Sequence, residues 1–166
     1  FDWIMEAIKR LKAYYKFNTQ YEMTRDLQMG LFGELCTVLD FYDKGYEDIL
    51  RGWKGPLREP QDFFISNHSY EVKTIGLHSE EIRINGARQL HSSYPLTLIV
   101  VMIDEIEDGI SVHDLVQMIN GRLDGVELEL FNELLIKYGY LEMQQNVFHY
   151  AVCRISKYNV EDEFPR

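Results

Sequence analysis

The chain has 166 residues, of which 46% are hydrophobic, and it carries a formal net charge of −10. This length predicts a single domain over residues 1–166, and because the chain begins at Phe1 it could be a fragment of a longer protein. The acidic balance argues against binding nucleic acid through charge alone, since such proteins present a basic surface. No apolar run approaches the length of a membrane span and no secretory signal is recognisable, so we expect a cytoplasmic protein with no membrane partner.

Two helices are predicted in the first quarter of the chain. Residues 1–16 have apolar side chains at helical spacing and a basic opposite side, which we interpret as a solvated face, with contact to DNA phosphates as the alternative. A second helix is predicted over 19–41, starting at a capping box. Gly30 and Gly33 inside it are poor helix formers and indicate close approach of another backbone. Glu34 follows them, and by spacing alone it would be an ordinary exposed glutamate.

A β-hairpin is the clearest local feature of the next segment. Residues 49–53 could form a short first strand, and a turn follows them. Residues 61–65 are rich in aromatic and β-branched side chains, which predicts a strand. The polar residues 66–69 form a turn, and residues 70–75 form a second strand that closes at Gly76.

The second half of the chain mixes strands with amphipathic helices. Residues 79–90 begin a helix at Ser79 or start as a strand and turn helical at Asn85. The continuous apolar run at 94–104 predicts a strand buried on both faces at the centre of the sheet, ended by an acidic turn. The remaining predicted elements are a helix capped by Ser111 to Asp114, a helix over 127–138 that ends at Gly139, a strand over 147–156 and a solvated acidic tail.

The hairpin brings charged side chains together. Because side chains alternate along a strand, Glu71 and Lys73 share one face and Val72 points to the other. The neighbouring strand can bring Asp62 to the face of Glu71 and Lys73. Two carboxylates and an ammonium group at one end of a hairpin suit a hard divalent cation and an anionic substrate. The alternative is a surface hairpin with an exposed Glu–Lys pair.

These residues resemble a known family. Asp62 followed by Glu71-Val72-Lys73 is similar to the signature of PD-(D/E)XK nucleases, although Gln61 separates Pro60 from the aspartate. The fuller set resembles a bacterial subgroup of PD-(D/E)XK proteins found near restriction systems. It consists of GLFGEL (30–35), WKGP (53–56), QDF (61–63) and EVKT (71–74).

The resemblance implies an α/β fold with a restriction-endonuclease-like αβββαβ core, a central mixed sheet flanked by helices and extra C-terminal helices. It implies Glu34, Asp62, Glu71 and Lys73 as catalytic residues. Asp62 and Glu71, with the carbonyl of Val72, would hold Mg²⁺, for which Mn²⁺ could substitute. Gln89 is a weaker candidate for substrate contact, since a helix at this position flanks the site in related nucleases.

Three functions are open at this point. The first is a Mg²⁺-dependent DNA endonuclease of restriction type, acting as a homodimer or within a larger defence complex. The second is a PD-(D/E)XK nuclease of repair, recombination or RNA processing, and the third is a non-catalytic acidic protein-interaction domain. The charge distribution bears on the choice: residues 51–91 hold six Lys or Arg against five Asp or Glu, a local charge of +1, so the acidity lies mostly away from the hairpin.

Overall fold

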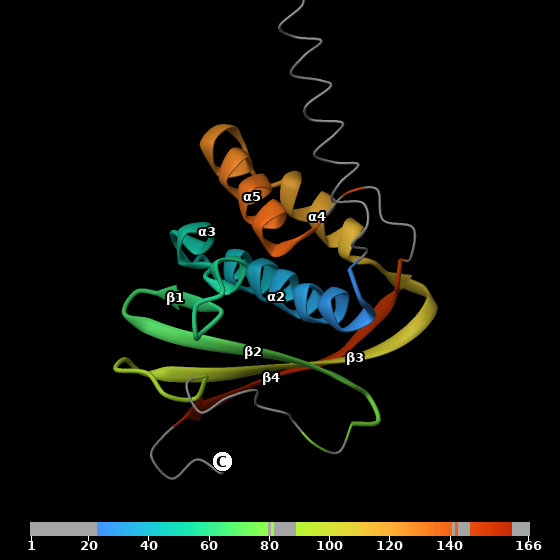
Figure 1. The fold of residues 1–166 in the computed structure, drawn as a ribbon, viewed down its shortest axis with the longest axis horizontal. Coiled ribbons are helices and arrows are strands. Elements are labelled where there is room, and N and C mark those ends of the chain that lie inside the picture. Colours follow the sequence, from blue (N-terminus) through green and yellow to red (C-terminus); the bar gives the residue numbers. More distant parts are fainter. Residues whose placement is uncertain (1–22, 80, 82–88, 141, 143–146, 161–166) are drawn as a thin grey trace, which may run out of the picture.

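The structure is a computed structural model that describes residues 23–79, 81, 89–140, 142 and 147–160. The helix predicted over 1–16 and the acidic tail lie outside these residues. The elements, in chain order, are α2 (Arg25–Asp43), α3 (Ile49–Gly52), the 3-10 helix η1 (Gly55–Leu57), β1 (Phe63–Ile65), β2 (His68–Gly76), β3 (Leu96–Ile110), α4 (Val112–Asn120), α5 (Gly125–Tyr138) and β4 (Tyr150–Val160) (Figure 1).

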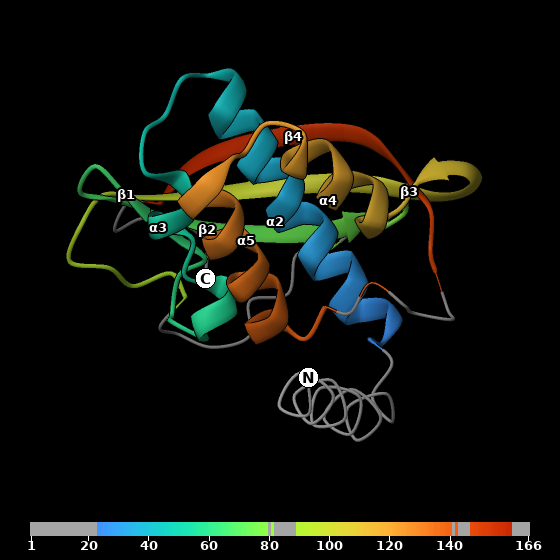
Figure 2. The same cartoon turned by 90° about the horizontal axis from the view of Figure 1, so that it is seen from above.

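A four-stranded mixed sheet forms one layer of the fold. Its strand order is β1-β2-β3-β4, with β2 and β3 parallel and the two outer pairs antiparallel. Helix α2 lies across one face of the sheet, and α4 and α5 lie on the other side of α2 (Figures 1 and 2). The predicted α/β class, with a mixed sheet flanked by helices, is confirmed. None of the described helices is long and apolar enough to cross a membrane.

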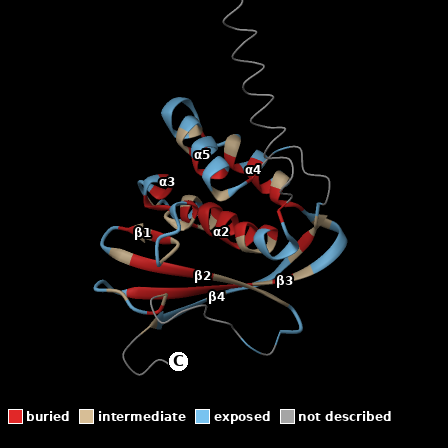
Figure 3. Ribbon diagram, in the orientation of Figure 1, coloured by how far each residue is buried: buried red, intermediate tan, exposed pale blue. Residues whose placement is uncertain are grey.

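The main core lies between α2 and the sheet, where buried residues gather (Figure 3). Helix α2 contributes Leu31, Leu35 and Val38, each fully buried. The central strand β3 contributes Ile99 and Val101 to the same cluster, while its Leu98 and Val100, on the opposite face, are also buried. The prediction that β3 is covered on both faces is therefore confirmed. Strand β2 pairs with β3 and also packs on α2, which fixes its position.

Two predictions near the N-terminal side of the site are wrong. Residues 49–53 are not a strand: Ile49–Gly52 form the single helical turn α3, and Trp53 makes only an isolated bridge to Phe63. The turn is closely packed, since a Cβ on Gly52 would come within 2.7 Å of the Phe64 carbonyl oxygen. Helix α2 begins at Arg25, later than predicted, and the predicted capping box at 19–22 lies outside the described residues. Its cap is Thr24, whose hydroxyl accepts a hydrogen bond from the Leu27 N–H.

Other boundaries also differ from the predictions. Strand β3 runs on to Ile110 instead of ending in an acidic turn at 104–109, and the irregularity there leaves both Glu105 and Ile110 paired with Tyr150. Strand β4 begins at Tyr150, three residues later than predicted. The element predicted over 79–90 lies mostly outside the described residues. The capping box at Ser111 and the end of α5 at Gly139 are confirmed.

Candidate active site

A tight hairpin places Asp62 beside β2. Strands β1 and β2 are joined by Ser66 and Asn67, both with positive φ, the conformation of a two-residue hairpin turn. The register pairs Phe63 with Tyr70, so Asp62 stands opposite Glu71. Two backbone hydrogen bonds reach the Asp62 carbonyl from η1 and the residue before it, at 2.6 Å from Lys54 N and 3.0 Å from Gly55 N. These two hydrogen bonds fix the backbone of Asp62 just before β1 begins.

The carboxylate of Asp62 reaches across to β2. Its Oδ2 accepts a hydrogen bond from the Val72 N–H at 2.8 Å. Burial raises the pKa of Asp62 to about 6, against the opposing effects of the Val72 N–H and the ammonium group of Lys73. The side chain of Val72 points into the core beneath α2, as predicted from the alternation.

Glu71 and Lys73 form an ion pair on the face predicted for them. Lys73 Nζ lies 2.7 Å from Glu71 Oε1, and Glu71 is fully buried while the side chain of Lys73 keeps 16% of its surface exposed. Burial, followed by repulsion from Asp62, raises the pKa of Glu71 to about 8 despite the lysine. The Oε2 atom of Glu71 is buried and has no hydrogen-bond partner in the described part of the chain.

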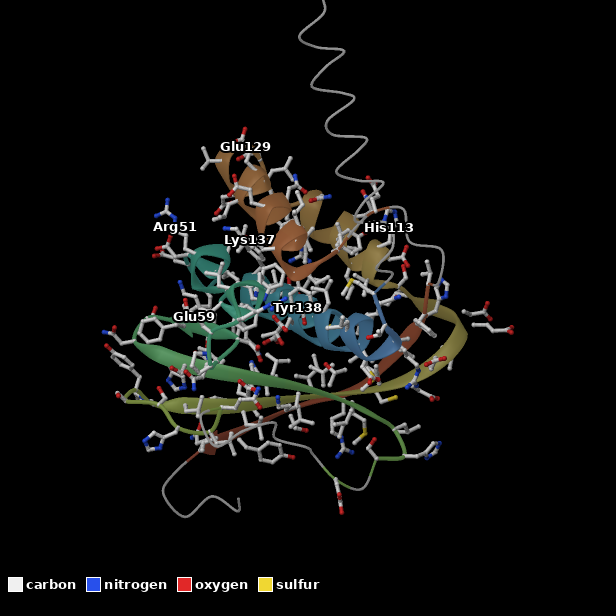
Figure 4. All side chains as sticks on the ribbon, viewed as in Figure 1. Arg51, Glu59, His113, Glu129, Lys137 and Tyr138 are labelled. Atoms are coloured by element: carbon white, nitrogen blue, oxygen red, sulfur yellow. The ribbon has the colours of Figure 1, made fainter. Side chains whose placement is uncertain are left out.

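Glu34 approaches the same place from α2. Its Oε2 accepts a hydrogen bond from Trp53 Nε1 at 2.6 Å, and its Oε1 accepts one from the Tyr138 hydroxyl at 2.8 Å. Tyr138 comes from the C-terminal end of α5, which lies over α2 (Figure 4). Burial raises the pKa of Glu34 well above its usual range, and repulsion from Asp62 adds to this. Glu34 is therefore a buried carboxyl held by two donors, not an exposed helical residue.

Glycines make room for this arrangement. A Cβ on Gly55 would collide with the Glu34 carboxylate, and one on Gly33 would collide with the Thr74 hydroxyl of β2. A Cβ on Gly30 would lie 3.3 Å from the Tyr138 hydroxyl. The close approach that the sequence indicated for Gly30 and Gly33 is real, but it is made by side chains and not by another backbone.

A cleft of about 920 Å³ lies beside Glu34, Asp62 and Lys73. It runs beside β2 beyond residue 70, the last residue that pairs with β1. The lining residues that bear on the argument are Glu34, Asp62, Val72, Lys73 and Tyr138. Glu71 meets this cleft through its ion pair with Lys73. The structure thus brings together all four side chains predicted to be catalytic.

A family model matches residues 2–166, and its description reads "Putative PD-(D/E)XK family member, (DUF4420)". The chain belongs to this family. No curated protein and no solved structure matched the chain. PD-(D/E)XK proteins are typically nucleases, so membership indicates a nuclease-type function and confirms the resemblance seen in the motifs.

PD-(D/E)XK nucleases generally use divalent metals, so the donors in this cleft were tested for their fit to one. Within the described ranges, no group of three or more His, Cys, Asp or Glu side chains is arranged to hold a metal ion. The proposed set is smaller: the carboxylates of Asp62 and Glu71 and the carbonyl of Val72, an all-oxygen set of the kind Mg²⁺ prefers. Among the described residues, the unpartnered Glu71 Oε2 and the raised pKa values of both carboxyls indicate little positive charge near this pair. The donors therefore fit Mg²⁺, and their role as ligands stays a prediction.

Gln89 does not line the cleft in the described part of the chain. It lies in a turn, where its backbone carbonyl accepts a hydrogen bond of 3.5 Å from Gln61 Nε2, and its contact with substrate stays a prediction. Two residues of the site were missed from the sequence. Trp53 is fully buried and is also a donor to Glu34. Tyr138 gave no signal except its place at the end of a helix.

Proposed function

We propose that this domain is a Mg²⁺-dependent endonuclease that hydrolyses phosphodiester bonds in DNA, of the restriction type, acting as a homodimer or within a larger defence complex. The observation that carries the proposal is the placement of Asp62, opposite Glu71 and hydrogen-bonded to Val72, with Lys73 at the wall of an open cleft. Membership of the PD-(D/E)XK family and the motifs that resemble a restriction-associated subgroup support the choice of substrate and setting.

Each residue has a role that follows from its chemistry. Asp62 and Glu71, with the Val72 carbonyl, would hold Mg²⁺, which supplies positive charge for the scissile phosphate and lowers the pKa of a bound water. Lys73 offers a cationic hydrogen-bond donor at the cleft wall, placed to orient the attacking water or to stabilise negative charge that develops on the phosphate. Glu34 has both oxygens engaged by Trp53 and Tyr138, which suits a group that orients its neighbours.

Cleavage of supercoiled plasmid with Mg²⁺ or Mn²⁺ tests the proposal. Asp62→Asn and Lys73→Met should each lower the rate about 100-fold or more, by analogy with the loss of single groups at electrostatic sites. Asp26→Asn is the matched control, because Asp26 is an exposed carboxylate that lines the same cleft. Equal rates for Asp62→Asn and Asp26→Asn would contradict the assignment, as would cleavage that survives removal of all divalent ions.

Thermal unfolding gives a readout independent of activity. A ligand that binds only the folded state raises the melting temperature, and the shift grows with the logarithm of the ratio of ligand concentration to Kd. We expect Mg²⁺ or Mn²⁺ to raise the melting temperature of the unsubstituted protein and of Asp26→Asn, and to have little effect on Asp62→Asn or Glu71→Gln. The absence of cleavage together with the absence of any metal-dependent shift would favour the alternative of an acidic interaction domain.

A further inference from the structure

A second groove, of about 390 Å³, lies next to the cleft. Its lining residues include Lys54, Gln61, Phe64, Ser69 and Tyr94, and none of them lines the cleft. Consecutive residues line the two cavities, since Gln61 lines the groove and Asp62 lines the cleft. The groove therefore lies beside Asp62, where the proposed function places the cleaved bond.

The sheet places the groove on the face that carries the charged pair. Phe64 pairs with Ser69 in the antiparallel ladder, and directly opposed residues share a face. Ser69, Glu71 and Lys73 alternate along β2 and so point to that same face. Ser69 lies about 7 Å from Glu71 along the strand. The groove is therefore close to the residues proposed to act on the cleaved bond.

An exposed aromatic ring stands in this groove. Tyr94 keeps 49% of its surface exposed, and its ring packs against Phe64 with centroids 4.8 Å apart. Hydrogen bonds hold the segment that carries it: the Ser92 hydroxyl bonds both the Tyr94 N–H, at 3.1 Å, and the Ser69 hydroxyl, at 3.0 Å. The ring is therefore fixed in place before any ligand arrives, which reduces the entropy lost on binding.

The charge of the groove points to stacking rather than to phosphate attraction. Its one lysine, Lys54, is matched by one acid, Glu59, among the described lining residues. Aromatic rings bind single-stranded nucleic acid because every base offers a flat face, and this contact does not depend on net charge. A groove of this kind can act in a chain whose overall charge is −10.

We propose that this groove binds a nucleotide of the substrate strand that flanks the cleaved bond, with its base stacked on Tyr94. The inference rests on the proposed function, since it assigns a subsite to the same substrate. It requires that the base leave its duplex stack or that the flanking strand be single-stranded. Tyr94, supported by Phe64, is then a binding residue and takes no part in the chemical step.

Binding of a fluorescent 12-nucleotide single strand, measured by anisotropy, tests this inference. All variants carry Asp62→Asn so that the strand stays intact. Tyr94→Ala should weaken binding by about 5- to 100-fold, the range for loss of one base stack, and Tyr94→Phe should restore it. Tyr158→Ala is the control, because Tyr158 of β4 is 47% exposed and stands outside the groove, and it should leave binding unchanged.

The outcomes separate the two proposals. If the unsubstituted protein cuts plasmid but binding is the same for Tyr94→Ala as for Tyr158→Ala, the groove assignment is wrong and the nuclease assignment stands. If Tyr94→Phe is as weak as Tyr94→Ala, stacking is not the contact and the inference fails. A protein that neither cuts plasmid nor binds the strand overturns both.

Discussion

Replacing Tyr138 with phenylalanine isolates one hydrogen bond of the site. The change removes the hydroxyl that donates to Glu34 Oε1 at 2.8 Å and leaves the half-buried ring in place. A hydrogen bond to a neutral group contributes about 1 kcal/mol to stability and one to a charged group about 1.5–3 kcal/mol. These two cases bracket the bond to Glu34, so we expect the free energy of unfolding to fall by about 1–3 kcal/mol.

Urea unfolding at pH 7 and 25 °C measures this change. Tyr158→Phe is the control, since that tyrosine is 47% exposed and a surface change of this size should stay within about 0.5 kcal/mol. Plasmid cleavage by Tyr138→Phe should also slow, because Glu34 loses one of its two donors. A loss for Tyr138→Phe no larger than that for Tyr158→Phe would refute the reasoning that this bond fixes Glu34.

Two further predictions concern helix α2, which carries Glu34 and Gly33. Glu34→Gln should slow cleavage yet raise the free energy of unfolding, more at pH 8 than at pH 5. Folding raises the pKa of the Glu34 carboxyl, so the unsubstituted protein loses stability as the pH rises, whereas the glutamine amide does not titrate. Urea unfolding at the two pH values checks the sign. Gly33→Ala should cost about 1–3 kcal/mol, since the new methyl group collides with the Thr74 hydroxyl, and Thr74→Ala in the same chain should recover part of the loss. Equal stability of the single and double variants would contradict the collision.

The hairpin could be predicted because its signals are local. Turn residues and the alternation along 70–75 locate its two strands. The turn is nevertheless formed by Ser66 and Asn67 and not by the predicted 66–69, so β2 begins at His68, and only the observed register places Asp62 opposite Glu71. The burial of Glu71 could not be predicted in this way, because it depends on what covers that face of the sheet. The error over 49–53 has a similar cause: four residues with two apolar side chains fit a strand or a helical turn equally well, and tertiary packing decides.

The partners of Glu34 were beyond sequence reasoning for another reason. Trp53 stands 19 residues from Glu34 and Tyr138 stands 104 residues away, so neither contact has a periodic or spacing signal. The two glycines of α2 were the one sequence feature that indicated a close contact at this part of the helix. Gly30 predicted that something comes close to the helix, and only the fold shows that this is the Tyr138 hydroxyl. Helix α5, at the other end of the chain, is therefore part of the site.

The charge balance of the site argues that its residues are there for chemistry. Glu34 and Glu71 are buried, Asp62 is half-buried, and the three carboxyls repel one another. Lys73 is the one cation paired with any of them in the part of the chain that the structure describes. Buried charges destabilise a fold unless they are paired, and apolar side chains at such positions are often neutral or stabilising. Packing therefore gives no reason for three carboxyls here. The divalent cation proposed to lie between Asp62 and Glu71 would give one, because it would supply positive charge beside these carboxyls.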